Sequence, residues 1–490
     1  MATPPPPQPE LDWTPERARA LGERAVALWE ELLTLLPGLP VDRGRPADEV
    51  RAAVALDVPD QGLDDDALMG HLRELALERS MYPGHPGFMG YISGAGTVPG
   101  AVGELLAGAL NQNVGGWLLS PGASEVEAAL TRWLAARFGL PEGAGGLIVG
   151  GGAFATFIGL KLARDAHGGE DVRELGVREP LAVYASTEAH VVADRAADQL
   201  GLGSRAVRRV ATDAAGRLDP VALDAAIARD RAAGMRPIAV VATAGTTATG
   251  AIDPLPALAE RCERDALWLH VDAAYGGPAV LADDLRPLLA GIDRADSIAV
   301  DPHKWLYTPV ASGCVLVRDL RALAESFAVR ASYVQQDLEA TGRGVSYADL
   351  GPGFSRGFDA LKVWLSLLAH GSEAYGRRIS HDAALARYMG ELATERPDFE
   401  LAAPVGLSIC CFRYVPPGWA SDDPRLDDLT ERLFTAIQLD GRAYCSNAVI
   451  DGRQALRACI VNFRTEAPDV ERLLDVAAEL GARLAADRAA

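Results

Sequence analysis

Lysine is scarce in this chain. Among 490 residues it occurs at positions 161, 304 and 362, and the remaining basic charge is arginine. Arginine stays charged and cannot form a Schiff base, whereas a buried lysine can lose its proton and attack a carbonyl carbon. Lys304 stands apart because it follows an apolar run over residues 297–300 and lies between His303 and Trp305. This stretch alone leaves two interpretations open, a nucleophile and a solvated loop charge.

Basic residues are also fewer than acidic ones, with 47 lysines and arginines against 67 aspartates and glutamates. The formal net charge is −20 and the sequence pI is about 4.9. Such a chain would repel a phosphate backbone, so nucleic acid is not an expected partner, and it offers no basic helix to a membrane surface. No signal peptide is visible, and no apolar run is long enough to span a bilayer. The sequence therefore predicts a soluble, cytoplasmic protein.

Cysteine patterns typical of metal sites and disulfide frameworks are missing as well. The six cysteines form no CxxC pair and show no metal-site spacing, and most of them lie in apolar runs. We expect reduced core residues and no metal. The six are Cys262, Cys314, Cys410, Cys411, Cys445 and Cys459.

The start of the chain predicts helices and no sheet. Amphipathic patterns cover residues 14–36, 46–56 and 64–79, and Thr14 and Asp64 are the expected N-caps of the first and third. These helices would expose apolar faces if left alone, which predicts an arm that packs on a second subunit of a homodimer. The expected domains are a helical arm over 1–85, a large domain over 86–370 and a small α+β domain over 371–490.

Strand and helix patterns alternate through the middle of the chain. Short apolar runs predict strands at 145–149, 181–185, 206–210, 237–243, 267–271, 297–300 and 313–317. This alternation predicts an α/β fold with a mostly parallel sheet, covered by helices on both faces, whose ligand lies outside the carboxyl ends of the strands. The polar residues at those ends are His190, Thr246, Thr247, Asp272, His303 and Lys304.

A glycine cluster, Gly150-Gly151-Gly152-Ala153, separates the first of these strands from a helical pattern. Free N–H groups and the positive end of the helix can hold a phosphate there. The cluster is neither GxxxxGK[ST] nor GxGxxG, so ATP and dinucleotides lack support as ligands. A tight turn required for packing is the alternative.

One cofactor needs a lysine, a strand-end aspartate, an imidazole and an anion site together, namely pyridoxal 5′-phosphate (PLP). Its aldehyde forms a Schiff base with lysine, and an aspartate beside the pyridine nitrogen keeps that nitrogen protonated. The glycine cluster would take the phosphate, and an imidazole can stack on the ring. Each of these residues has a structural explanation when it is considered alone. Their joint placement at the strand ends favours a PLP site instead.

The sequence resembles the group II PLP-dependent decarboxylases, and among them the aromatic L-amino-acid decarboxylases. The resemblance covers about residues 80–470 and implies the type I (aspartate aminotransferase-like) fold. It also implies a homodimer that decarboxylates an L-amino acid, with Trp, Tyr, Phe or Dopa expected. The motifs that carry it are His85-Pro86-x-Phe88-x-Gly90-Tyr91, Ser120-Pro121, the glycine cluster, Ala189-His190, Gly245-Thr246-Thr247, His270-Val271-Asp272-Ala273-Ala274-Tyr275, Asp301-Pro302-His303-Lys304-Trp305, Phe358-x-x-Leu361-Lys362-x-Trp364 and Asn462-x-Arg464-Thr465.

The resemblance also implies a role for each matching residue. Lys304 is the Schiff-base lysine and Asp272 the partner of the pyridine nitrogen. His190 stacks on the cofactor ring, and Ala274 lies against the opposite face. The other implied cofactor contacts are Gly151, Gly152, Ala153, His303 and one of Thr246 and Thr247.

A polar, glycine-bearing stretch over residues 330–356 predicts a lid that excludes water during chemistry. Counting back from Phe358 places Tyr347 where the family keeps the tyrosine that returns a proton to the substrate. Relatives with phenylalanine there are oxidative aldehyde synthases, so Tyr347 favours simple decarboxylation. An ordinary exposed loop tyrosine is the alternative. For the whole chain, an aldehyde synthase and a non-catalytic binding protein are the alternative functions, and an aminotransferase is less favoured.

The chain departs from the family at several places. Ala153 replaces a serine or threonine hydroxyl of many relatives, and Asp301 stands where some have asparagine. A carboxylate near the phosphate would be unfavourable unless it points away. Gly115 and Gly116 occupy a stretch where animal relatives have bulkier residues, which predicts a roomy side-chain pocket. Arg464 could bind a substrate carboxylate or form a structural salt bridge.

Overall fold

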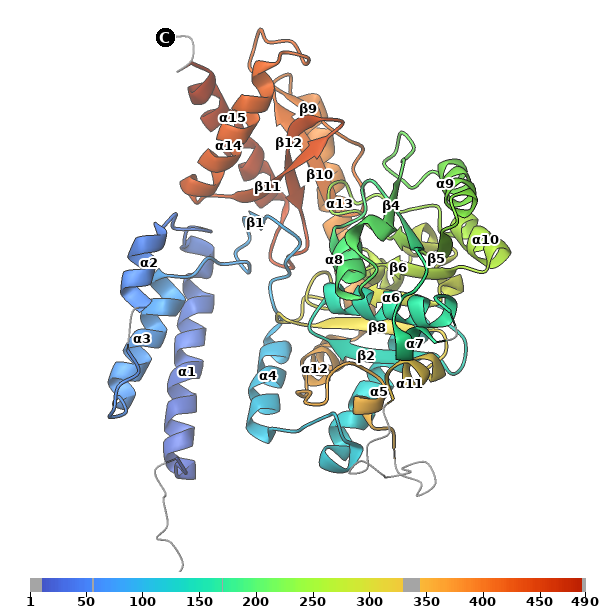
Figure 1. Ribbon diagram of the computed structural model, residues 1–490. Coiled ribbons are helices and arrows are strands. Elements are labelled where there is room, and N and C mark those ends of the chain that lie inside the picture. The colour runs from blue at the N-terminus through green and yellow to red at the C-terminus, as the bar shows by residue number, and fades with distance from the viewer. Residues whose placement is uncertain (1–10, 55–56, 170, 329–343, 487–490) are drawn as a thin grey trace, which may run out of the picture.

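A computed structural model of the chain describes residues 11–54, 57–169, 171–328 and 344–486. Figure 1 shows a group of N-terminal helices at one side, a large α/β body and a C-terminal sheet with its own helices. The predicted α/β fold is confirmed, because the body is built on a seven-stranded, mostly parallel sheet. In the part of the chain that the structure describes, no helix has the length and apolar character of a membrane span.

The N-terminal arm consists of α1 (Pro15–Leu35), α2 (Ala47–Val54) and α3 (Asp65–Glu78). Both predicted N-caps are confirmed, since the Thr14 hydroxyl accepts the Arg17 N–H and the Asp64 carboxylate accepts the Ala67 N–H. Neither α1 nor α2 buries a residue. The arm therefore leaves its apolar side chains open, as its sequence pattern predicts.

The central sheet has the strand order β2-β8-β7-β6-β5-β3-β4. Neighbouring strands from β4 to β7 run parallel, while β8 runs antiparallel to both β7 and β2. The predicted parallel sheet is thus interrupted by one reversed strand. The strands are β2 (Gly145–Val149), β3 (Leu181–Ser186), β4 (Val207–Val210), β5 (Arg236–Thr243), β6 (Trp268–Asp272), β7 (Ser297–Val300) and β8 (Gly313–Val317).

Helix α6 packs closely on the middle of this sheet. A Cβ atom on its Gly159 would lie 2.4 Å from Nδ1 of His270 in β6, so only glycine allows this approach. His270 is fully buried, lies 2.8 Å from the Ser297 hydroxyl, and has its pKa lowered to about 4 by burial. The helices of the body are α4 (Val98–Leu110), α5 (Pro121–Arg137), α6 (Gly152–His167), α7 (Val172–Leu175), α8 (Val192–Gln199), α9 (Pro220–Ala232), α10 (Leu255–Asp265), α11 (Arg321–Phe327) and α12 (Ala360–His370).

A second sheet, of order β1-β11-β12-β10-β9, forms the C-terminal part. Its first strand comes from far away in the sequence, because β1 pairs with β11 and Phe88 lies opposite Tyr444. We propose the three domains that the sequence predicts, with β1 added to the C-terminal one. The elements are β1 (Phe88–Met89), α13 (Ser372–Glu395), β9 (Phe399–Leu401), β10 (Ile409–Tyr414), α14 (Arg425–Asp440), β11 (Tyr444–Ile450), β12 (Arg453–Cys459) and α15 (Ala467–Ala486).

A buried carboxylate ties the turn after β7 to the C-terminal part. Asp382 of α13 accepts hydrogen bonds from Trp305 Nε1 at 3.0 Å and from the Tyr307 hydroxyl at 2.7 Å, and it pairs with Arg378 at 2.8 Å. Burial raises the pKa of Asp382 to about 6, with Arg378 opposing the shift. The residues that follow Lys304 are therefore anchored to α13.

Candidate active site at the carboxyl edge of the sheet

The carboxyl ends of the parallel strands meet at one edge of the central sheet. Asp272, the last residue of β6, is in register with Thr243 of β5 and Ala299 of β7. Lys304 follows β7, and His190 follows β3 on the same edge. The structure therefore brings together side chains that are more than one hundred residues apart in the sequence.

Lys304 and Asp301 form an ion pair just after β7. The Lys304 Nζ atom lies 2.9 Å from Asp301 Oδ2, and 4% of the aspartate side chain is exposed. Burial alone would lower the pKa of Lys304, but the carboxylates of Asp301 and Asp272 outweigh it and raise that pKa. The amine is thus charged at neutral pH and becomes a nucleophile only when this proton leaves. Burial by itself does not free the amine, contrary to the sequence argument.

The glycine cluster forms a cup at the start of α6. Gly151 has φ +139°, and the N–H groups of Gly152 and Ala153 find no acceptor among the described residues. A Cβ on Gly152 would lie 2.8 Å from Asp301 Oδ2 and 3.1 Å from the Ala274 Cβ, so the cup opens toward both. These N–H groups and the helix dipole can hold an anion.

Gly313, at the start of β8, supports the cup from behind. A Cβ there would lie 2.4–2.6 Å from the main-chain atoms of Gly151. No side chain fits between the two segments, so glycine is required where the loop crosses the strand. Sequence reasoning missed this role, because the contact joins residues remote in the chain and neither has a chemical side chain.

Asp272 and His190 have fixed orientations. The Asp272 Oδ1 atom accepts the Ala274 N–H at 3.1 Å, and His190 Nδ1 accepts the Val192 N–H at 3.2 Å. Burial lowers the pKa of His190, against the charge of Asp272. The neutral imidazole then carries its proton on Nε2. We refer to Asp272, His190, Asp301 and Lys304 as the Lys304 group.

The predicted contacts Thr246, Thr247 and His303 lie at the same edge. The Thr246 hydroxyl is fully buried and bonds within its own turn, to the Thr249 hydroxyl and the Ala251 N–H. Thr247 is half-buried, which leaves it the better placed of the two to reach a ligand. The His303 ring is held by the main chain of Ser312, beside the cup.

Tyr347, the predicted proton donor, makes its contacts with residues outside the Lys304 group. It is 4% exposed, its hydroxyl donates to the main-chain oxygen of Ser124 at 3.4 Å, and the guanidinium of Arg356 lies 4.8 Å from the ring centre. Burial raises the pKa of its phenol. These are the contacts of a packed core residue. Residues 330–343 of the predicted lid, including Tyr333, lie outside the described residues.

Two residues that the sequence associated with the substrate have other contacts. The Arg464 Nη1 atom approaches the Gly84 oxygen at 3.5 Å and its guanidinium lies 4.6 Å from the Phe463 ring centre, while no acidic side chain among the described residues pairs with it. Gly115 itself leaves no room for a side chain, because a Cβ there would lie 1.9 Å from the Phe354 oxygen, whereas a Cβ on Gly116 would lie 3.4 Å from the nearest atom of Leu119. Main chain fills the space at Gly115.

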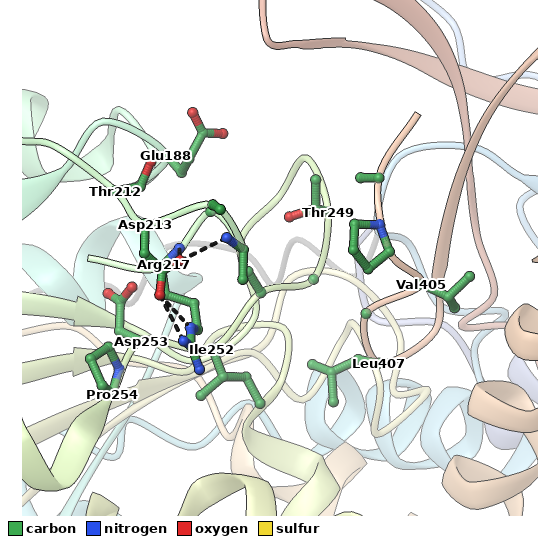
Figure 2. A pocket seen from close by; sticks show the side chains of 18 of the residues that line it. Glu188, Thr212, Asp213, Arg217, Thr249, Ile252, Asp253, Pro254, Val405 and Leu407 are labelled. Atoms are coloured by element: carbon green, nitrogen blue, oxygen red, sulfur yellow. Dashed lines mark hydrogen bonds and ion pairs between the residues drawn. The ribbon is translucent and has the colours of Figure 1, made fainter. Parts of the chain in front are cut away.

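A cleft of about 650 Å³ is lined by residues outside the Lys304 group. Loops over 212–217, 249–256 and 402–407 supply most of its walls, and Glu188 reaches its rim. Figure 2 shows Asp213 and Arg217 bonded to each other on one wall, where Nε and Oδ2 lie 2.8 Å apart. No member of the Lys304 group lines this cleft, so the residues that the sequence predicts to be catalytic do not belong to it.

The residues at the sheet edge fit PLP. The cup offers free N–H groups, Lys304 supplies the amine, and Asp272 supplies a carboxylate on the neighbouring strand. One feature is unusual for a phosphate site, because the Asp301 carboxylate faces the cup. Ala153 adds no hydroxyl to offset it.

Comparisons with known proteins agree with this fit. A family model described as "Pyridoxal-dependent decarboxylase conserved domain" matches residues 46–415. An aromatic-L-amino-acid decarboxylase of Bacillus atrophaeus is 33% identical over 95% of both chains, and a phenylacetaldehyde synthase of Arabidopsis thaliana is 29% identical over 84% of this chain and 85% of its own. The crystal structure of Oryza sativa TDC with PLP and tryptamine superposes with a TM-score of 0.89 at 28% identity, over 96% of this chain and 99% of that one.

Gly313→Ala should damage the cup. The added methyl group must displace the Gly151 main chain, so we expect PLP to bind at least about tenfold more weakly and unfolding free energy to fall by about 1–3 kcal/mol. Equilibrium dialysis with PLP and urea denaturation measure the two effects. Gly122→Ala, whose new methyl meets open space, is the matched control. Unchanged PLP affinity in Gly313→Ala would contradict this account of the cup.

Proposed function

Because the chain belongs to the pyridoxal-dependent decarboxylase family, we propose that it removes the carboxyl group of an aromatic L-amino acid as carbon dioxide and releases the amine. It is a PLP-dependent amino-acid decarboxylase, and the Lys304 group beside the N-terminus of α6 is the observation that carries the proposal. The aromatic class rests on the relative from Bacillus atrophaeus, which is named for aromatic L-amino acids.

The cup would hold the cofactor's phosphate. The free N–H groups of Gly152 and Ala153 and the positive end of α6 supply the attraction, with Gly151 shaping the turn and His303 at its side. Because no hydroxyl contributes at Ala153, the main chain bears most of this binding. That places a stronger demand on Gly313, which holds the main chain in position.

The strand ends would hold the cofactor's ring. PLP supplies a protonated pyridine ring that accepts the electron pair left when the carboxylate departs. Asp272 is oriented by the Ala274 N–H and can hold the proton on the pyridine nitrogen, with Ala274 against one face of the ring. His190 lies at the other face with its Nε2 proton available, and we assign Thr247, not Thr246, to the ring substituents.

Oxidative aldehyde formation is a second candidate, favoured by the similarity to phenylacetaldehyde synthase. The two functions differ in products, since an aldehyde synthase consumes oxygen and yields hydrogen peroxide and ammonia. Decarboxylation is better supported because the family and the relative of highest coverage given above are decarboxylases. A non-catalytic binding protein is disfavoured because lysine, aspartate and histidine are all in place.

A homodimer accounts for an apolar surface on the body. Helix α4 exposes Leu105 by 66%, Leu106 by 47% and Leu110 by 56%, and Leu368 of the neighbouring α12 is 61% exposed. Contiguous apolar surface of this kind marks an interaction site, and Figure 1 shows α4 on the side that faces the arm. A second copy, engaged by this surface and by the arm, is the proposed partner. We place the protein in the cytoplasm, where its six buried free cysteines stay reduced.

The main test is a product assay with tryptophan, tyrosine, phenylalanine and Dopa, with aliphatic and acidic amino acids for comparison. We expect amine and carbon dioxide from at least one aromatic substrate and no hydrogen peroxide. Lys304→Ala should lower kcat/KM by roughly 10³-fold or more. Borohydride reduction of the PLP-loaded protein should attach the cofactor to Lys304, and Lys161 and Lys362 are internal controls. Attachment to another lysine, or aldehyde with peroxide, would reject the assignment.

Tyr347→Phe separates a packing role from a catalytic one. Its hydroxyl makes one long hydrogen bond to Ser124, so its removal should cost about 1 kcal/mol of stability and leave the amine as the product. Thermal unfolding and product analysis by mass spectrometry check both points. Tyr333→Phe, in the other tyrosine of the predicted lid, is assayed in parallel. If Tyr347→Phe converts the product to aldehyde, Tyr347 is the proton donor that the sequence predicted.

The dimer surface is tested by Leu105→Asp. A charge in the middle of the α4 surface should convert a particle of twice the 51.7 kDa chain mass into a monomer, measured by light scattering on a sizing column. Val221→Asp, on α9, places the same charge at a residue that is 71% exposed and should leave the dimer intact. A monomeric wild-type protein would reject the proposal.

A further inference from the structure

The Asp301 carboxylate occupies one side of the phosphate cup. Asp301 is 3% exposed, and its Oδ1 atom has no hydrogen-bond partner among the described residues. Its Oδ2 atom lies where a Cβ on Gly152 would be only 2.8 Å away. The oxygen that faces the residues that would hold the phosphate is thus Oδ2, the one paired with Lys304, while the other oxygen of this buried carboxylate is unpaired among the described residues.

The groups facing Asp301 come from several elements. Lys304 lies at 2.9 Å and His303 Nε2 at 3.9 Å, both in the turn after β7. On β8, burial raises the pKa of the Cys314 thiol, and the charges of Glu127 and Asp301 add to that shift. At the sheet edge, burial lowers the pKa of His190, and the charge of Asp301 partly opposes this shift. Lys304 is the cation closest to Asp301 in this set.

An ionised carboxylate and a phosphate dianion are both acceptors only. Facing each other in the cup, they would repel, and the Lys304 amine that now neutralises Asp301 is the group that joins the cofactor. Two acids that share a buried site commonly hold one proton between them, because both cannot ionise at once. Neither Ala153 nor the glycines have a side-chain donor to separate the two anions.

We propose that the cup takes up the cofactor's phosphate together with one proton, which the Asp301 carboxyl and the phosphate share. This inference rests on the proposed function, since it concerns the same PLP site. It makes Asp301 a binding residue that renders cofactor capture dependent on pH. Because binding consumes a proton, PLP affinity falls as the pH rises.

The test counts protons by calorimetry in buffers of different ionisation enthalpy at about pH 8, above the ordinary pKa values of aspartate and phosphate. PLP and pyridoxal are compared. Both join Lys304 by the same reaction, in which nitrogen bonds to the aldehyde carbon and water leaves, so their difference isolates the phosphate. We expect wild-type protein to take up about one proton more with PLP than with pyridoxal, and Asp301→Asn to take up none in excess.

Affinity gives a second measurement. Between about pH 7 and 9, wild-type affinity for PLP should fall by roughly tenfold per pH unit relative to Asp301→Asn, and the variant should bind PLP more tightly at pH 8. Asp301→Ser serves if the asparagine variant does not fold. Asp253→Asn, which changes another buried carboxylate at the cleft in Figure 2, should match the wild type.

Equal proton counts in wild type and Asp301→Asn, or weaker PLP binding by the variant at pH 8, overturn this inference alone. Failure of wild-type protein to bind PLP at Lys304 overturns the proposed function and this inference with it.

Discussion

The parallel pairing of β3, β5, β6 and β7 is the constraint on which the rest of the molecule depends. Parallel strands are buried on both faces, so their interiors are apolar and their chemistry begins where each strand ends. Because the carboxyl ends lie on one edge, Asp272, His190 and Lys304 meet without any local sequence relation. The reversed strand β8 adds a different contribution, since its first residue, Gly313, packs against the main chain of Gly151 in the cup.

Sequence patterns locate the central sheet well but miss β1 and β11 of the C-terminal sheet, for a physical reason. The predicted runs 297–300 and 313–317 coincide with β7 and β8, because each is a short apolar run bounded by polar turns. β1 is two residues long and exists only because Tyr444 and Cys445 lie beside it. β11 is buried in its first half and largely open in its second, so no single periodicity marks it. Pairing of this kind is not encoded locally.

At the candidate active site, the sequence predicts where residues lie in the fold but not where their side chains point. Strand ends place Asp272 and Lys304 from sequence alone, but the sequence could not say that Asp301 points into the cup or that Thr246 is used within its own turn. Counting residues back from Phe358 selected Tyr347, yet its hydroxyl direction depends on α5, which the count does not contain. A motif specifies which atoms are available, and the packing of remote elements decides where they point.

The residues on either side of Lys304 are held with unequal firmness. Trp305 and Tyr307 donate hydrogen bonds to the buried carboxylate of Asp382, and a hydrogen bond to a charged group typically contributes about 1.5–3 kcal/mol. The turn after Lys304 is therefore a fixed support. On the other side of the lysine, the pairing with Asp301 weakens when the amine forms a Schiff base, because the nitrogen then keeps at most one of its three N–H donors. The contact that weakens during cofactor capture is thus the one with Asp301, and its carboxylate is left facing the anion that arrives. The turn after Lys304 is held by hydrogen bonds to Asp382, whereas the Lys304–Asp301 ion pair changes when the cofactor binds. Asp301 is therefore the residue that we propose controls how PLP binding depends on pH.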